Sequence, residues 1–450
     1  MNQPSPAPGS EISNELGARR AAWMALDAVL LQGLTMDAAL EAALRDSAAL
    51  QSRDRAFARL LLATSLRRLG ALKSVLARLI ERPLGAGSAN KDAGRSIEHV
   101  VMLGLAQLLY LDTPAHAAVD TSVRLIGDSR FAGLKGLVNA VLRRAAREKA
   151  KLRGTLAEPR IDVPDHLWQS WQAAYGEATA LAIAQAHLIE PPLDLTVKGD
   201  TALWAEKLGA EILPTGSLRL RQAGAIENLA GFDEGAWWIQ DAAAALPARL
   251  LGDMRAKSVA DLCAAPGGKT MQLAAGGAHV VAVDRSAPRL ARLRQNLARA
   301  QIPATQVEIA TIDATQWQPR KRFDALLIDA PCTATGTLRR RPDVAWSKSV
   351  ADVARLADLQ RRLLARAGDL LGTGGTLIYC VCSLQPEEGE RQIASLLAHD
   401  KRWSLDPIAP AELPGLEPAI LANGTVRTLP SMWAERGGID GFFIARLRLA

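Results

Sequence analysis

Residues 258–270 read Ser-Val-Ala-Asp-Leu-Cys-Ala-Ala-Pro-Gly-Gly-Lys-Thr, and this stretch decides the fold of the second half of the chain. The apolar residues at its start predict a strand, and the paired glycines predict a tight turn that leads into a helix. A strand that delivers a glycine-rich turn to a helix N-terminus is where an α/β protein holds a nucleotide-like ligand. Gly267 and Gly268 let such a ligand approach the main chain closely, because they carry no side chain.

Two common nucleotide-binding sequences do not match this turn. The phosphate-binding loop of NTPases requires G-x-x-x-x-G-K-[ST], and Cys263 stands where its first glycine should be. The dinucleotide-binding sequence G-x-G-x-x-G is absent as well. A nucleoside cofactor with little phosphate remains, and S-adenosylmethionine is the one that we expect.

Further strands are expected downstream, each ending in an acidic or thiol side chain. The expected strands are 279–284, 307–313, 323–329 and 376–382. Strands that alternate with helices predict an α/β fold with a doubly wound, mostly parallel sheet, in which ligands bind outside the carboxyl ends of the strands. The side chains expected at those ends are Asp284, Asp313, Asp329 and Cys382. Asp284 follows the glycine-rich turn by about 20 residues, the spacing at which a carboxylate reaches ribose hydroxyls.

The chain has four cysteines, and three of them lie on the two loops where a substrate would sit. These loops contain Asp329-Ala330-Pro331-Cys332 and Cys380-Val381-Cys382-Ser383. Cysteines placed in this way in a cytosolic protein indicate reaction rather than disulfides. No C-x-x-C sequence is present and no histidine lies near these cysteines in the sequence, so no metal site is expected.

A thiol beside a methyl donor suits methylation of carbon 5 of cytosine. This carbon is not nucleophilic until a thiol adds to carbon 6, and the addition divides one difficult step into two easier ones. A carboxyl group at the N3 edge of the base favours the addition by supplying a proton or a hydrogen bond. Asp329 is placed for this role.

Residues 261–270, 329–336 and 381–388 closely resemble the NOL1/NOP2/Sun family of RNA cytosine-5 methyltransferases. The resemblance implies that Cys382 is the nucleophile and that Cys332 resolves the covalent adduct, whereas DNA cytosine methyltransferases use the thiol of a Pro-Cys sequence. The family often has a small residue where Cys380 stands, so we expect Cys380 to be buried in its strand. The cofactor site that the resemblance implies consists of Cys263, Ala264, Ala265, Pro266, Gly267, Gly268, Lys269, Asp284, Asp313 and Asp329.

The first third of the chain differs in kind. Residues 15–153 are rich in Ala, Leu and Arg, with apolar residues at helical spacing and no strand pattern, which predicts an all-α bundle. Residues 104–119 and 134–144 resemble NusB-like RNA-binding domains. The resemblance implies that this part of the chain binds RNA.

Basic residues at two places are expected to contact RNA phosphates. Arg143 and Arg144 begin a basic run at the end of the helical domain, for which a solvated helix face is the alternative explanation. Arg339, Arg340 and Arg341 follow the Cys332 loop directly. The net charge of +7 and the pI near 9.4 favour a nucleic acid partner, since neutralised phosphates supply most nonspecific affinity.

The expected organisation is a flexible tail (1–14), a NusB-like domain (15–153), a connecting α/β subdomain (154–250) and a methyltransferase domain (251–450). No apolar run of membrane length and no signal peptide is found, so a cytoplasmic location is expected. The resemblance implies methylation of one cytosine in 16S rRNA, at position 967, while the RNA is still unassembled. We expect the protein to act as a monomer. The alternatives are the same chemistry on transfer RNA or 23S rRNA, and a non-catalytic RNA-binding or antitermination factor.

Overall fold

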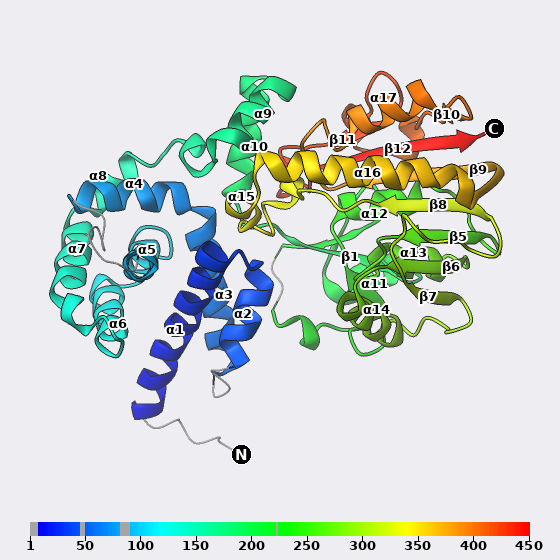
Figure 1. Cartoon of the computed structure of the whole chain (residues 1–450). Coiled ribbons are helices and arrows are strands. Elements are labelled where there is room, and N and C mark those ends of the chain that lie inside the picture. The colour runs from blue at the N-terminus through cyan, green and yellow to red at the C-terminus, as the bar shows by residue number, and fades with distance from the viewer. Residues whose placement is uncertain (1–7, 46–49, 82–90, 222–223) are drawn as a thin grey trace, which may run out of the picture. The chain divides into compact units, whose positions relative to one another are not determined.

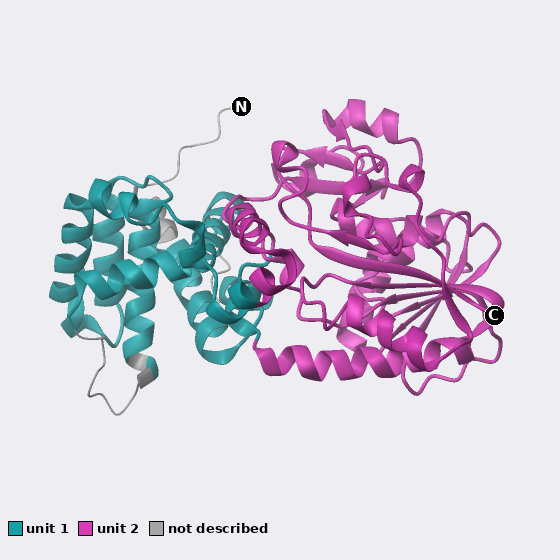
Figure 2. Cartoon of the chain, turned by 90° about the horizontal axis from the view of Figure 1, so that it is seen from above, with its two compact units in different colours: residues 1–169, 341–348 teal, residues 170–340, 349–450 magenta. Residues whose placement is uncertain are grey.

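The computed structural model describes residues 8–45, 50–81, 91–221 and 224–450, which form two compact units (Figure 2). Unit 1 comprises residues 1–169 and 341–348, and unit 2 comprises residues 170–340 and 349–450. The division differs from the expected one at the connecting subdomain. Its first residues, 154–169, belong with the helices, and its sheet belongs with the methyltransferase domain.

Unit 1 is helical throughout its described residues (Figure 1), as the spacing of its apolar residues predicts. Its helices are α1 (Pro8–Gln32), α2 (Met36–Arg45), α3 (Ser52–Arg67), α4 (Leu69–Leu79), α5 (Lys91–Leu109), α6 (Ala115–Gly127), α7 (Lys135–Arg147), α8 (Lys149–Gly154) and α15 (Val344–Ser347), and α9 (Asp165–Tyr175) crosses into unit 2. Helix α5 packs against α1, α3, α4, α6 and α7, and their apolar faces share one buried core.

The predicted N-terminal tail requires a correction. Helix α1 begins at Pro8, so residues 8–14 are helical and continue directly into the bundle. Residues 1–7 lie outside the described part of the chain. None of the described helices is both long and apolar enough to cross a bilayer.

Unit 2 contains a large sheet, which in its described residues has the strand order β10-β12-β9-β8-β5-β6-β7, with β11 paired to β12. Its strands are β5 (Ser258–Leu262), β6 (His279–Asp284), β7 (Val307–Thr311), β8 (Phe323–Asp329), β9 (Leu371–Val381), β10 (Trp403–Leu405), β11 (Val426–Thr428) and β12 (Phe442–Leu449). The strands from β5 to β9 pair in parallel, while β10, β11 and β12 are antiparallel. This confirms the mostly parallel sheet, and the three C-terminal strands are additions that the sequence analysis did not predict.

Helices cover both faces of the large sheet, because successive side chains of each strand point to opposite faces. Val280 and Ala282 of β6 belong to the face packed by α12 (Ala242–Arg249), α13 (Gly268–Ala275) and α14 (Ala287–Arg299). Val281 and Val283 belong to the face packed by α16 (Val350–Leu370) and α17 (Glu390–His399). The site therefore has to form at the strand ends, where the helices leave the sheet edge open.

A smaller antiparallel sheet precedes the large one, with the order β2-β3-β1-β4. Its strands are β1 (Leu193–Val197), β2 (Glu211–Ile212), β3 (Leu218–Leu220) and β4 (Trp237–Ile239), accompanied by α10 (Glu177–His187) and α11 (Thr201–Leu208). Leu195, Leu218 and Trp237 form its core with Trp204 of α11. The buried packing of Trp237 follows from this core.

Candidate active site and cofactor site

The predicted glycine-rich turn connects β5 to α13 and is held by α14. Gly267 has a φ of 106°, in the left-handed region, and a Cβ at this position would lie 2.9 Å from Leu293 Cγ. Glycine is therefore required here. Asn296 donates from Nδ2 to the Pro266 carbonyl oxygen at 2.9 Å, which fixes the turn against the helix.

A small hollow of about 90 Å³ opens beside this turn. Its lining residues are Cys263, Val283, Asp284, Arg285, Arg289, Ile312, Asp313, Ala314, Pro331, Leu359 and Leu363. Three of the predicted cofactor residues, Cys263, Asp284 and Asp313, are thus brought together. Leu359 and Leu363 come from α16 and add an apolar wall that no sequence pattern had indicated.

The two acidic residues of the hollow are anchored by main-chain and side-chain groups, among them Arg289, whose Nη1 lies 3.3 Å from Asp284 Oδ2. The Asp284 carboxylate is buried and accepts hydrogen bonds from the Ser286 N–H at 2.9 Å and the Ala265 N–H at 3.3 Å. Asp313 accepts from the hydroxyl and the N–H of Thr315, and these hydrogen bonds hold the pKa of Asp313 below its usual value. Carboxylates fixed in this way suit the hydroxyl groups of a ribose.

Asp261, directly before the turn, was not among the predicted site residues. It is buried, Thr270 donates its hydroxyl to Oδ2 at 2.6 Å, and Oδ1 has no hydrogen-bond partner among the described residues. Burial raises the pKa of Asp261 to about 7. A buried carboxyl oxygen without a partner is unusual, and a hydrogen-bond donor of a bound cofactor would satisfy it. The residues present therefore fit a nucleoside cofactor that also carries an amino group.

The two predicted thiols meet at the carboxyl edge of the sheet. Strands β8 and β9 are parallel neighbours with Asp329 opposite Cys380, and the loops that follow them place Cys332 Sγ 3.5 Å from Cys382 Sγ. Both sulfurs can therefore reach one base. The contact with Cys382, together with burial, raises the pKa of the Cys332 thiol well above its ordinary value.

Asp329 is held by two donors, one on each carboxylate oxygen. Lys269 donates from Nζ to Oδ2 at 2.7 Å, and the Cys380 thiol lies 3.6 Å from Oδ1. Burial alone would lower the pKa of Lys269, but the Asp329 carboxylate outweighs burial and raises it above the usual range. Lys269, predicted among the cofactor contacts, thus binds Asp329. Cys380 is fully buried in β9, as expected, and burial raises the pKa of its thiol.

Glu388 joins the two thiol-bearing loops, and sequence reasoning missed its role. The fully buried carboxylate accepts hydrogen bonds from the Thr333 N–H at 3.0 Å, from the Thr333 hydroxyl and from Gln360 Nε2 at 3.1 Å. Gln360 also donates to the Pro331 carbonyl oxygen at 2.9 Å. Burial raises the pKa of Glu388, while the Ser383 and Thr333 hydrogen bonds oppose this shift. Only the fold brings these residues together.

A second set of hydrogen bonds ties the same loops through Ser383. Its hydroxyl lies 3.1 Å from Thr333 Oγ1 and 3.3 Å from Thr335 Oγ1, and the Gly336 N–H donates to the Cys382 carbonyl oxygen at 2.9 Å. The two sulfurs are therefore positioned by a buried network before any substrate arrives. Such positioning lowers the entropy that the reaction has to overcome.

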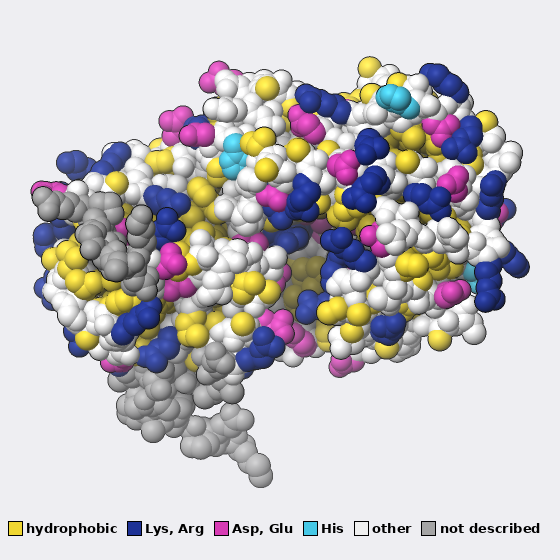
Figure 3. All heavy atoms as spheres, in the orientation of Figure 1, with side chains coloured by type: hydrophobic (Ala, Val, Ile, Leu, Met, Phe, Trp, Pro, Cys, Tyr) yellow, Lys and Arg dark blue, Asp and Glu magenta, His cyan; other side chains and the backbone are white. Residues whose placement is uncertain are grey.

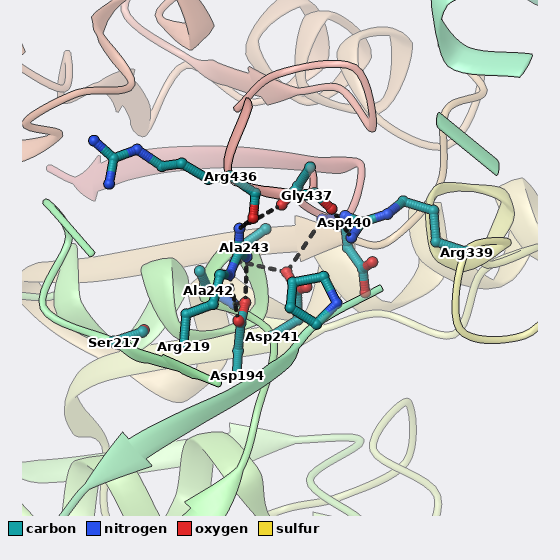
Figure 4. Close-up of polar contacts among 12 residues, drawn as sticks. Asp194, Ser217, Arg219, Asp241, Ala242, Ala243, Arg339, Arg436, Gly437 and Asp440 are labelled. Atoms are coloured by element: carbon teal, nitrogen blue, oxygen red, sulfur yellow. Dashed lines mark hydrogen bonds and ion pairs between the residues drawn. The ribbon is translucent and has the colours of Figure 1, made fainter. Parts of the chain in front are cut away.

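Arg339 and Arg340, both predicted to contact RNA, are held by groups of unit 2, and Arg339 is drawn in Figure 4. Arg339 is 1% exposed and donates from Nη2 to the Gly437 carbonyl oxygen. Arg340 forms ion pairs with Asp241 and Asp440, its Nε lying 3.2 Å from Asp440 Oδ2. Arg339 is therefore too buried to contact an RNA phosphate, while the side chain of Arg340 is 22% exposed and its guanidinium group pairs with carboxylates of unit 2.

The same buried cluster contains a second pair. Arg219 donates to both oxygens of Asp194, at 2.7 Å from Nε and 2.7 Å from Nη2, and its Nη1 donates to the Gly438 carbonyl oxygen at 2.8 Å. Figure 4 shows Arg219, Asp194 and Asp241 of the small sheet region facing the 436–440 loop. The cluster fastens that loop to the small sheet.

The remaining predicted RNA contacts are on the surface. Arg143 and Arg144 are exposed on α7, and Arg341 is half-buried. Figure 3 shows Lys and Arg side chains spread over the visible face rather than gathered in one patch. The net charge alone therefore does not locate an RNA site.

Comparison with known proteins agrees with this geometry. The family model "16S rRNA methyltransferase RsmB/F" matches residues 248–448, and the NusB family model matches residues 16–147. Ribosomal RNA small subunit methyltransferase B of Pasteurella multocida is 35% identical over 396 residues, with 84% of each chain covered. The enzyme of the same name from Pseudomonas putida is 34% identical over 450 residues, covering 96% of this chain and 98% of the relative.

Solved structures show the same fold. The crystal structure of PH0851 matches with a TM-score of 0.76 at 21% identity, covering 99% of this chain and 100% of that chain. A methyltransferase homolog from Pyrococcus horikoshii matches 64% of this chain and 100% of its own, with a TM-score of 0.52 and 26% identity. The identity over nearly the full length of the relatives shows that the chain belongs to the ribosomal RNA small subunit methyltransferase B family of S-adenosylmethionine-dependent methyltransferases.

Proposed function

We propose that the chain methylates carbon 5 of a cytosine in RNA, with Cys382 as the nucleophile and Cys332 as the residue that helps to release the product. One observation carries the proposal. Two thiols lie 3.5 Å apart at the edge of the sheet, and the carboxylate that ends β8, Asp329, is held in place by Lys269. A single thiol would serve addition alone, whereas a pair allows separate groups to act in addition and elimination.

S-adenosylmethionine, when bound, supplies the methyl group. The turn at 263–268 and the carboxylates of Asp284 and Asp313 would hold the nucleoside part of this cofactor, and Leu359 would contact the base of that nucleoside. Asp261 Oδ1, which has no hydrogen-bond partner among the described residues, would accept a hydrogen bond from the amino group of the cofactor. With these assignments the methyl donor would lie on the same edge of the sheet as the thiols. They extend the predicted cofactor set by Asp261 and Leu359.

The chemical steps use the residues at the strand ends. The proton of Cys382 passes through water to Asp329, and the sulfur bonds to carbon 6 of cytosine. The π electrons of the C5=C6 bond move toward N3, with which Asp329 shares that proton. Carbon 5 then takes the methyl group, with the demethylated cofactor as the leaving group. Cys332, after passing its own proton to water, removes the hydrogen on carbon 5 as a proton. The electron pair of that C–H bond re-forms the C5=C6 bond, and the C6–S bond breaks to release the Cys382 thiolate.

The proposed substrate is 16S rRNA that has not yet been assembled, with the cytosine at position 967 as the target and Arg143 and Arg341 among the contacts. The relatives named as small subunit methyltransferases support this RNA over transfer RNA or 23S rRNA. We propose that the protein acts as a monomer in the cytoplasm.

The experiment compares Cys382→Ala with Cys332→Ala on unmodified 16S rRNA. Cys382→Ala should methylate at background level, because no adduct can form. Cys332→Ala should accumulate an RNA–protein adduct that survives a denaturing gel, because elimination is slowed. The reverse pattern would assign the nucleophile to Cys332.

The target is tested by bisulfite sequencing of RNA from a strain that lacks the gene. Loss of one methylated cytosine in 16S rRNA is expected. Loss confined to transfer RNA or 23S rRNA would redirect the substrate, and no loss in any RNA, with inactive purified protein, would support a non-catalytic RNA-binding factor.

A further inference from the structure

An open groove of about 590 Å³ runs between α6 and α7 of unit 1, helices that lie side by side (Figure 1). It is lined by Ala115, His116, Val119, Asp120, Val123, Asn139, Arg143, Ala146 and Arg147. The volume lies in the range of sites that take a molecule of nucleotide size. It is remote in sequence from every residue of the proposed active site.

One wall of the groove is a polar and cationic stripe. Asn139, Arg143 and Arg147 are spaced four residues apart on α7, so they lie above one another on a single face of the helix. Asn139 Oδ1 accepts from Arg143 Nε at 3.0 Å, which orients the guanidinium without neutralising it. Both arginines are exposed.

The opposite wall is the first part of α6, which begins beside the groove. His116 is exposed in its first turn, and that turn has no acidic residue and no side-chain cap on its N–H groups. The one carboxylate of the groove, Asp120, lies 3.7 Å from Arg124 Nη1. The arginines therefore outweigh the acid, and an anion is attracted.

The floor consists of small apolar side chains. Ala115, Val119, Val123 and Ala146 offer a surface for the flat face of a base, while the arginine stripe offers donors to phosphate oxygens. In double-stranded RNA the base faces are stacked and hidden, so only an unpaired nucleotide presents a face and a phosphate together.

We propose that this groove binds a phosphodiester-linked unpaired nucleotide of RNA, with Arg143 and Arg147 on the phosphates. The inference rests on the proposed action on RNA and names the part of the helical unit that grips it. Arg144, predicted with Arg143, does not line the groove, because its Nε is 2.9 Å from Glu148 Oε1. This difference between neighbours supplies a matched control.

The test measures binding of a labelled single-stranded oligoribonucleotide to the full-length protein by fluorescence anisotropy over a range of KCl concentrations. The Arg143→Ala/Arg147→Ala double variant should bind about tenfold more weakly, and its salt slope should fall by about 1.4, since each phosphate contact to a single strand contributes about 0.7. Arg144→Ala should stay within about twofold of the parent, because it removes an arginine that faces Glu148.

Methylation by the double variant separates this inference from the proposed function. At saturating RNA its kcat should equal that of the parent while its KM for RNA rises. If binding and salt slope match those of Arg144→Ala, the groove assignment is overturned and the proposed methylation stands. The groove assignment would also be overturned if the double variant lost as much affinity for a duplex of the same sequence as for the single strand. It would likewise be overturned if an acidic peptide displaced the labelled RNA at a lower concentration than unlabelled RNA does.

Discussion

Glu388→Gln tests whether the buried network positions the thiols. The carboxylate accepts hydrogen bonds from the N–H and the hydroxyl of Thr333, from Gln360 and from the Ser383 hydroxyl. Glutamine has the same shape but only one acceptor oxygen, and its NH₂ group must face a donor. If the amide oxygen replaces Oε1, the Thr333 N–H and Gln360 keep their acceptor. The Ser383 hydroxyl can donate to Thr335 Oγ1 instead, so the Thr333 hydroxyl is the donor that loses its partner.

The magnitude follows from that one lost acceptor. An unsatisfied buried donor costs about 1–3 kcal/mol. The loop that bears Cys332 can shift so that the unsatisfied Thr333 hydroxyl finds another partner. If the whole free-energy cost then enters the reaction barrier, kcat falls about 5- to 160-fold, because about 1.4 kcal/mol corresponds to a factor of ten. The KM for S-adenosylmethionine should hardly change, since Glu388 does not line the hollow beside the turn.

The assay is single-turnover methyl transfer to 16S rRNA at several temperatures, with the melting temperature measured in parallel. Glu387→Gln is the matched control, because the neighbouring carboxylate pairs with Arg391 at 2.9 Å and is partly exposed. The reasoning is refuted if both variants transfer methyl groups at the same rate. A lower melting temperature with an unchanged rate would show that the network serves stability alone.

Three further outcomes are expected. Asp284→Ala should weaken S-adenosylmethionine binding at least about tenfold through the loss of a charge-assisted hydrogen bond, and calorimetry showing equal affinity would remove Asp284 from the site. Burial raises the pKa of Asp261 to about 7, so between about pH 4 and pH 7 the folded state keeps a proton that the unfolded chain has released. The free energy of unfolding should therefore fall as the pH rises through this range. Asp261→Asn should flatten this part of the urea-derived stability curve, and an unchanged difference between pH 4 and pH 8 would contradict the raised pKa. Arg340→Ala removes the ion-pair partner of the buried Asp241 and Asp440 and should lower the free energy of unfolding by about 3–5 kcal/mol. A loss of RNA affinity at unchanged stability would instead support the predicted contact of Arg340 with an RNA phosphate.

Local sequence patterns were sufficient to predict the backbone elements that carry the site. The strand, the glycine-rich turn and the helix of residues 258–275 follow from apolar periodicity and from a conformation that Gly267 adopts readily. The meeting of Cys332 and Cys382 was also accessible, because parallel neighbouring strands end at the same edge of a sheet.

The tertiary structure alone decided which charged groups face water. Arg339 and Arg340 belong to a run of three arginines, and the sequence of this run does not indicate whether its side chains contact RNA or buried carboxylates. The carboxylates that bind Arg340 lie about a hundred residues away, one on each side in the sequence. Glu388 likewise finds Thr333 55 residues earlier in the chain. Periodicity reports the face that an element buries, whereas the partner of a buried charge is set by contacts between distant segments, which form only when the whole unit has packed.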